Sequence, residues 1–189
     1  MSPASDAQIM LQVRDGNATM LGELFERHHV ALFNYFLRLS AKRAFSEDMV
    51  QEVFLRVLKY HHTYRGESEF KVWLYRIARN AWIDHLRKKR LARVSLDENG
   101  LQEPVSSDPL PQQVLEEEQR RNLLKQALAQ LTPDKREVLV LSRYQDMRYE
   151  EIAQVLDCTV SNVKIKVHRA IKELRVIVKQ LTAEVDFAG

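Results

Sequence analysis

The sequence is poor in the residues that cross-link small proteins or form their tight turns. Its single cysteine, Cys158, excludes an internal disulfide framework and any zinc or iron–sulfur site built from several cysteines. Glycine and proline number only 5 each among 189 residues, which is few for an all-β sandwich or a glycine-rich nucleotide-binding fold. We therefore expect an all-α protein.

Long apolar runs are also lacking. No stretch approaches the roughly 20 apolar residues of a membrane span, and the N-terminus does not have the basic-then-apolar pattern of a signal peptide. Apolar residues nevertheless make up 45% of the chain and charged residues 29%, so a packed core is expected. These features predict a soluble protein in the reducing environment of the cytoplasm.

The net charge of +3 hides an uneven distribution along the chain. Residues 1–93 carry 16 Lys and Arg against 10 Asp and Glu, whereas residues 94–129 carry 3 against 7. The cations concentrate in residues 71–93 and again in residues 160–179. Two basic segments separated by an acidic stretch suggest two modules that contact one polyanion such as nucleic acid, although two solvated helix faces would give the same pattern.

The apolar residues recur at helical spacing along nearly the whole chain. Helices are expected over residues 21–39, 46–62, 68–90, 114–130, 134–145, 149–156 and 160–181. Ser46 is the predicted N-cap of the second of these. The pattern disappears from about residue 94 to 113, where three of the five prolines lie, so this stretch is predicted to be a flexible linker. The expected organisation is thus a helical domain over 1–93, a linker over 94–113 and a second helical domain over 114–189.

Two short predicted helices near the C-terminus, 149–156 and 160 onward, are separated by a three-residue turn, which is the spacing of a helix-turn-helix. The second helix has one apolar side and one polar side. On the polar side, Arg169 could pair with a guanine, Asn162 with an adenine, and Ile165 could contact a thymine methyl group in the major groove. Any amphipathic helical hairpin has a similar pattern, but the basic charge favours DNA.

The predicted helix over 68–90 has two apolar sides and one cationic side, which suggests a helix clamped in a bundle with its cations outward. Aromatic residues are frequent nearby, and rings among cations suit single-stranded nucleic acid, because bases stack on rings while Lys and Arg hold phosphates. Aromatic residues at helical spacing more often belong to a core. Phe70 and Trp73 are therefore expected in the core, and Tyr64 and Tyr75 are left open between the two roles.

The predicted helix over 46–62 has an outward face on which Leu55 lies among polar and acidic residues. A leucine in such a setting could anchor a protein partner. The acidity of this face makes it unsuited to DNA.

Three blocks of the sequence resemble a known family, the sigma factors of bacterial RNA polymerase. The segment Asp48–Arg56 resembles region 2.2, and Phe70–Arg90 resembles regions 2.3 and 2.4. Leu131-Thr132-Pro133, Arg136-Glu137-Val138, Tyr149–Ala153, Val163-Lys164 and His168-Arg169-Ala170 resemble region 4. The order of the blocks, the linker and the length resemble the extracytoplasmic-function (ECF) group, which has only regions 2 and 4.

The resemblance implies a partner and a role for each block. Region 2.2 would bind the clamp coiled coil of the largest subunit of core RNA polymerase, through Asp48, Gln51, Glu52, Leu55 and Arg56. Regions 2.3 and 2.4 would capture the unwound −10 strand, through Tyr64, Tyr75, Arg76, Asn80, Ile83, Arg87, Lys88 and Arg90. Region 4 would read the −35 duplex through Ser161, Asn162, Lys164, Ile165, His168, Arg169 and Lys172. It would also meet the polymerase flap. An anti-sigma factor is a further implied partner.

Ile165 and Lys166 depart from residues that are frequent in the family, a small polar residue and an arginine respectively. Because Ile165 lies on the expected groove-facing side, the −35 sequence cannot be transferred from relatives. Two other readings remain open: a stand-alone helix-turn-helix regulator that binds DNA without polymerase, and a metalloenzyme. Glu26 and His29 have the spacing of one helical di-iron pair, but that architecture needs two such motifs. We expect no catalytic site, no metal and no cofactor.

Overall fold

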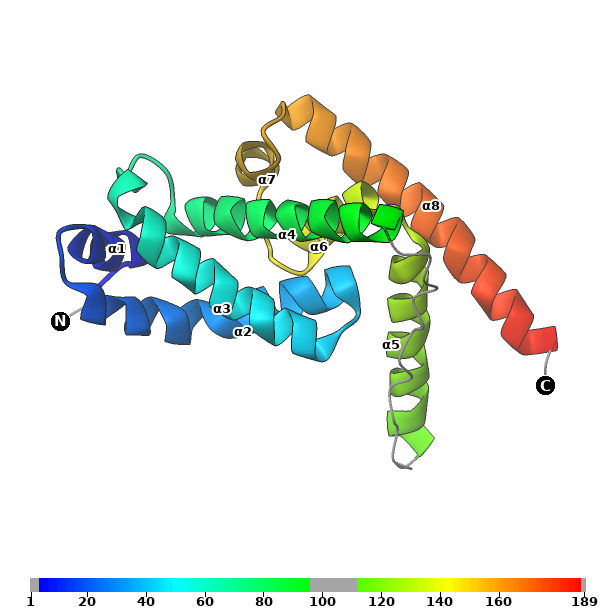
Figure 1. The fold of residues 1–189 in the computed structure, drawn as a ribbon. Helices are drawn as coiled ribbons and strands as arrows, with labels where there is room; N and C mark the ends of the chain where they lie inside the picture. The colour runs from blue at the N-terminus through cyan, green and yellow to red at the C-terminus, as the bar shows by residue number, and fades with distance from the viewer. Residues whose placement is uncertain (1–3, 96–111, 188–189) are drawn as a thin grey trace.

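The structure, a computed structural model that describes residues 4–95 and 112–187, consists of α-helices and two short 3₁₀ turns, with no strand in those ranges (Figure 1). The elements are α1 (Asp6–Arg14), η1 (Ala18–Met20), α2 (Leu21–Ser40), α3 (Arg43–Tyr60), η2 (His61–Thr63), α4 (Phe70–Ser95), α5 (Gln112–Gln130), α6 (Pro133–Arg143), α7 (Tyr149–Leu156) and α8 (Val160–Phe187). Helices α1–α4 form an N-terminal bundle and α5–α8 a C-terminal bundle. The expected all-α fold with two small helical domains is therefore confirmed.

Most of the expected linker lies outside the described residues, and its two ends belong to α4 and α5. None of the helices in the described ranges is long and apolar enough to cross a membrane.

Helix α1 was not expected from the sequence. Its N-terminus carries a capping box, in which the backbone N–H of Gln8 donates to Ser5 Oγ and the backbone N–H of Ser5 donates to Gln8 Oε1. Asp6 accepts a hydrogen bond from Arg27 at 2.7 Å and lies 2.7 Å from His28 Nε2, which ties α1 to α2. The buried side chains of α1 are Ile9, Met10 and Val13. With nine residues and three buried positions, the apolar pattern is too short to be recognised by periodicity.

Helix α3 begins at Arg43, three residues earlier than expected, and Ser46 is not its N-cap. Ser46 is fully buried within the first turn, and its hydroxyl donates to the backbone carbonyl of Lys42 at 2.6 Å. A serine that hydrogen-bonds to the carbonyl four residues back occurs inside helices as well as at their ends, so the residue type alone did not define the helix start.

Helix α4 passes between α3 and the C-terminal bundle (Figure 1). Its side chains Leu74, Tyr75 and Ala78 are buried, and Trp82 is only 7% exposed. Because apolar contacts cover two sides of this helix, Arg76, Arg87 and Arg90 are left exposed on the remaining side. The expected clamped helix is present.

The C-terminal bundle contains the expected helix-turn-helix. Helix α7 ends at Leu156 and is followed by Asp157, which adopts a left-handed conformation with φ 52°; α8 begins at Val160 after the short turn. Val163, Val167 and Ala170 are at most 2% exposed, so the apolar side of α8 packs against the rest of the bundle. Proline at the first position of α6 suits a helix start, because proline has no N–H that the helix would need to satisfy.

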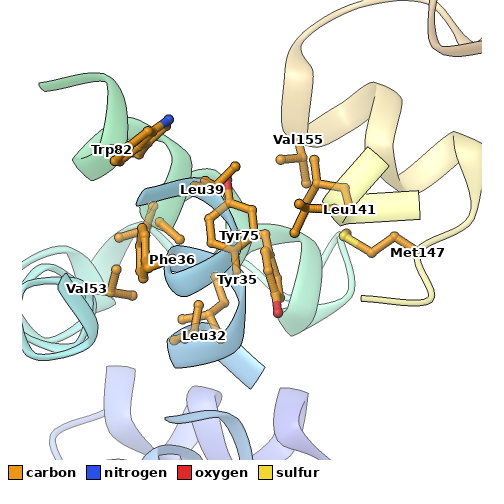
Figure 2. Packing of buried hydrophobic residues seen from close by; sticks show 14 of the residues in the cluster. Leu32, Tyr35, Phe36, Leu39, Val53, Tyr75, Trp82, Leu141, Met147 and Val155 are labelled. Carbon is orange, nitrogen blue, oxygen red and sulfur yellow. The ribbon is translucent and has the colours of Figure 1, made fainter. Parts of the chain in front are cut away.

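The two bundles pack directly against each other. Helices α2 and α4 contact α6 and α7, and Figure 2 shows Leu141 and Met147 of the C-terminal bundle lying beside Tyr35 and Tyr75 of the N-terminal bundle. All four side chains are at most 4% exposed. The buried core is therefore continuous between the two bundles.

Candidate polymerase and DNA interfaces

The outward face of α3 combines acidic and polar groups with exposed apolar side chains. Asp48 and Gln51 are exposed, Glu52 is half-buried, and Leu55 is 63% exposed. One helical turn further, Leu58 is 43% exposed. Leu58 was not singled out from the sequence, although its three-residue spacing from Leu55 places it on the same side. Together these side chains form the α3 face, in which acidic and polar groups are followed along the helix by two exposed leucines.

Arg56 is less available to a partner than the sequence suggested. Its guanidinium binds Glu52 on its own helix at 2.6 Å and Asp84 on α4 at 2.8 Å. Partial burial works against the charged form of Arg56, but the hydrogen bonds to both carboxylates outweigh it and raise the pKa of the guanidinium. The residue therefore joins α3 to α4, and its role is to hold the α3 face in place.

The cationic side of α4 lies at the surface, where side chains can reach a ligand. Its exposed members are Arg76, Asn80, Arg87, Lys88 and Arg90, and Ile83 is half-buried among them. We call these six residues the α4 face. Guanidinium and ammonium groups in such a row can bind successive phosphates of a nucleic acid, and the asparagine amide can hydrogen-bond with a base.

The structure corrects the expectation for the two tyrosines. Tyr64 and Tyr75 are each 1% exposed, so neither ring can stack on a nucleic-acid base. The hydroxyl of Tyr64 donates to the carbonyl of Ser68, and the hydroxyl of Tyr75 binds the side chain of Gln145 in the C-terminal bundle. Burial raises the pKa of both phenols, so they stay protonated. Phe70 is buried as expected, and Trp73 is half-buried and packs against the core.

Three aromatic rings pack together and support the C-terminal half of α4. Their association was not predicted from the sequence. Phe45 of α3 lies 4.2 Å from the ring of His85 and 5.9 Å from that of Trp82, and the rings of Trp82 and His85 stack. Burial, followed by the neighbouring cations Lys89 and Lys88, lowers the pKa of His85. An uncharged imidazole suits this aromatic packing, which holds the cationic end of α4 against α3.

On α8, all seven side chains that were expected to face DNA are exposed, and Val163, Val167 and Ala170 between them are buried. These seven form the α8 face: Ser161, Asn162, Lys164, Ile165, His168, Arg169 and Lys172. Ile165 is 49% exposed, as the helical-wheel analysis of the sequence predicted. The face has the donors and the apolar group that a major groove can accept.

Polar contacts cap the first turns of both helices of the helix-turn-helix, α7 and α8. The hydroxyl of Thr159 accepts a hydrogen bond from the backbone N–H of Asn162 at 3.2 Å. At the start of α7, the carboxylate of Glu151 accepts hydrogen bonds from Arg148, which lower the pKa of Glu151 although burial opposes this. These contacts satisfy backbone N–H groups in the first turns of the two helices.

Within the part of the chain that the structure describes, no group of three or more His, Cys, Asp or Glu side chains is arranged to hold a metal ion. Cys158 is half-buried in the turn before α8. The groups that do gather at the surface are cations on α4 and α8 and an acidic, leucine-containing face on α3. Charged and apolar faces of this kind are suited to binding nucleic acid and protein.

Comparison with known protein families gives two matches in this chain. The family model of sigma-70 region 2 matches residues 24–92, and the model of sigma-70 region 4 matches residues 121–174. The RNA polymerase sigma factor CarQ of Myxococcus xanthus is 32% identical over 93% of this chain and 99% of its own length. The ECF RNA polymerase sigma factor SigX of Bacillus subtilis is 34% identical over 80% of each chain.

Two solved structures share the fold. CnrH, in complex with the cytosolic domain of CnrY, is 25% identical and superposes with a TM-score of 0.71 over 94% of this chain and 99% of that one. The sigma factor RpoE of Bartonella quintana, in complex with the anti-sigma factor NepR, is 25% identical with a TM-score of 0.66 over 84% of this chain and 96% of that one. The matched regions and the identity across nearly the full length agree with the sequence resemblance: this chain belongs to the sigma-70 family of RNA polymerase sigma factors, in its ECF group.

Proposed function

We propose that this sigma factor divides its work among the three faces. The α3 face binds core RNA polymerase, the α4 face captures the opened −10 strand, and the α8 face reads the −35 duplex. The corresponding units are a region 2 domain over residues 1–93, a linker over 94–113 and a region 4 domain over 114–189. The observation that carries this proposal is that three chemically different faces lie exposed on three separate helices.

The α3 face is the polymerase contact because its chemistry suits protein and not DNA. Its acidic groups would repel phosphates, whereas they are complementary to a basic surface such as a clamp coiled coil. Leu55 and Leu58 provide the apolar centre that a protein interface requires. Arg56 acts indirectly, since its bonds to Glu52 and Asp84 hold this face against α4.

The α4 face suits a strand whose bases are accessible. With Tyr64 and Tyr75 buried, phosphate binding by the arginines and lysine carries this role, and Asn80 and Ile83 are the groups left to contact a base. The α8 face suits intact duplex, because an α-helix fits the major groove of B-DNA. Arg169 and Asn162 are positioned to read base edges there.

Further partners follow from the family. An anti-sigma factor is proposed as the regulator, supported by the likeness to a sigma factor that was solved with its anti-sigma factor. The place of action is the cytoplasm, where polymerase and chromosome meet. The proposed role is that of an initiation factor with no catalytic residue and no cofactor of its own.

The proposal is tested by run-off transcription with core bacterial RNA polymerase, this protein and a genomic fragment library. Transcripts that start downstream of shared, spaced −35 and −10 motifs are expected, and the protein should co-elute with core polymerase. Absence of both would contradict the proposal and favour a stand-alone regulator that binds duplex DNA. Core polymerase alone and polymerase with heat-denatured protein are the controls.

A further inference from the structure

The row of exposed side chains on α8 continues beyond the α8 face. At about 100° per residue, Ser161, His168 and Lys172 of the α8 face lie within an arc of about 60° that also contains Arg175 and Lys179. Both of these cations are exposed. They lie about one and about two turns beyond Lys172, on the same side of the helix. We call Arg175 and Lys179 the distal cations.

The opposite side of α8 is packed along this whole length. Ala170 and Ile177 are buried, and Leu174, Val178 and Leu181 are partly buried against the core. Because these positions follow one another at steps of three or four residues, the packed side stays on one side of the helix. The backbone positions of the distal cations are therefore held in line with the α8 face.

The distal cations are available to an external anion. Between residues 160 and 181 the sequence has six Lys and Arg and a single acidic residue, Glu173. That carboxylate forms an ion pair with Lys135 of α6, to the side of the row. In the part of the chain that the structure describes, neither distal cation makes a hydrogen bond or an ion pair. The row thus keeps an uncompensated positive charge past the end of the α8 face.

This row is too long to lie against base edges over its full length. From Ser161 to Lys179 it extends about 27 Å, at a rise of about 1.5 Å per residue. The major groove is about 12 Å wide and winds around the duplex, whereas α8 continues without a break to Phe187 (Figure 1). In a helix-turn-helix, the N-terminal residues of the second helix contact the bases. The C-terminal part of α8 then leaves the groove and passes the phosphates at its edge.

We propose that Arg175 and Lys179 bind backbone phosphates next to the −35 element, outside the base pairs that the α8 face reads. The proposal rests on the proposed function of the α8 face and extends it. Phosphate contacts carry no base identity, so the distal cations add affinity for any sequence and fix the orientation of α8 on the duplex. They thus lengthen the region 4 footprint without changing its sequence preference.

The test is the double variant Arg175→Gln/Lys179→Gln, bound to core polymerase, on a promoter found by run-off transcription. Each neutralised phosphate contributes about 0.9 to the slope of log affinity against log salt, so the slope should fall by about two units. The affinity deficit of the variant should consequently shrink about tenfold between 50 and 200 mM salt. The ratio of affinities for matched and mismatched −35 elements should stay the same. An unchanged slope overturns the proposal.

The matched control is Arg120→Gln/Lys125→Gln on α5, because it removes the same two types of exposed cation away from α8. Equal loss of slope in the two double variants would be a general effect of net charge and would overturn the proposal. Titration with core polymerase in the absence of DNA tests for another partner. Weaker polymerase binding with an unchanged slope would assign the distal cations to a protein interface, which also overturns the proposal.

Neutral methylphosphonate linkages locate the contact. Placed in the base pairs that flank the −35 element, first on one side and then on the other, they should weaken wild-type binding on the side that the distal cations touch. The double variant should be insensitive on that side, and equal losses in both proteins overturn the proposal. In that case a −35 preference of the wild type still supports the proposed function. If the wild type has no −35 preference, the proposed function fails and this inference fails with it.

Discussion

The hydroxyl of Tyr35 on α2 donates a 3.0 Å hydrogen bond to the carboxylate of Glu137 on α6, and neither residue is more than 5% exposed. The two residues are 102 positions apart in the sequence and belong to different bundles. A buried carboxylate with one phenol and one guanidinium near it is sensitive to protonation. This pair therefore links the stability of the packing between the two bundles to pH.

The first prediction concerns Glu137→Gln. Burial raises the pKa of Glu137 above its ordinary value of 4.5, and Arg79 and Tyr35 oppose the shift only in part. An acid whose pKa is raised by folding stabilises the fold fully below its unfolded pKa, and this contribution is lost as pH rises through the folded pKa. Wild type should thus lose stability relative to Glu137→Gln as pH rises from about 4.5 toward 7, measured by urea unfolding at stepped pH. Parallel stability profiles of the two proteins would contradict this, and Glu26→Gln, on an exposed side chain, is the control.

The second prediction concerns the α3 face. Leu55→Asp should weaken binding to core polymerase by about 30-fold or more, because the central apolar residues of an interface carry most of its affinity. Leu58→Asp should have a smaller effect, in line with its lower exposure. Affinity is measured by fluorescence titration of labelled protein with core polymerase, and circular dichroism checks the fold.

The control for the α3 face is Val30→Asp on α2, where an apolar side chain is 57% exposed and therefore comparable to Leu55 at 63%. Equal losses for Val30→Asp and Leu55→Asp would show that the effect is not specific to the α3 face.

The third prediction separates polymerase binding from promoter opening. Arg76→Ala/Asn80→Ala should bind core polymerase normally but open the promoter at least tenfold less, since two exposed groups that would hold the opened strand are lost. Permanganate reactivity of unpaired thymines measures opening directly. Arg43→Ala, an exposed cation on α3 that is outside the three faces, should open the promoter as wild type does. A variant that loses polymerase binding together with opening would contradict the division between α3 and α4.

The fourth prediction concerns salt. With roughly 5 phosphates neutralised, promoter binding should weaken a few-hundred-fold between 50 and 200 mM salt. Lys172→Ala should lower the slope of log affinity against log salt by about one unit at every promoter sequence, whereas Arg169→Ala should also relax the preference at one base pair. Filter binding across a salt series with matched and mismatched −35 elements measures both effects. An unchanged slope for Lys172→Ala would show that Lys172 does not contact a phosphate. Lys125→Ala on α5 is the charge-matched control.

Local periodicity was sufficient to place the helices that carry the three faces. The predicted span of α7 agrees with the structure residue for residue, and the exposed side of α8 agrees with the helical wheel. Leu55 was expected to be exposed because Gln51 and Glu52, one turn before it, are polar, and the structure places it at the surface. Each of these features depends on residues within a turn or two of one another, so the sequence contains the necessary information.

Helix starts and short elements were less predictable. Ser46 has the residue type of an N-cap but lies inside α3, where its hydroxyl bonds to the carbonyl of Lys42 instead of capping the helix. Helix α1 escaped notice for a related reason. Its three buried residues gain their stability from contacts with other parts of the N-terminal bundle, which a short periodic pattern does not reveal.

Spacing along single helices was enough to predict the helical architecture, the helix-turn-helix and most of the exposed charged side chains. The burial of Tyr64 and Tyr75 became known only from the packed fold, since an aromatic residue beside a cationic stripe can turn toward either side until its neighbours are known. The packed fold also decided that Glu137 and Gln145 meet Tyr35 and Tyr75. Those contacts join residues at least 70 positions apart, and no periodicity within one helix specifies which surfaces of two bundles come together.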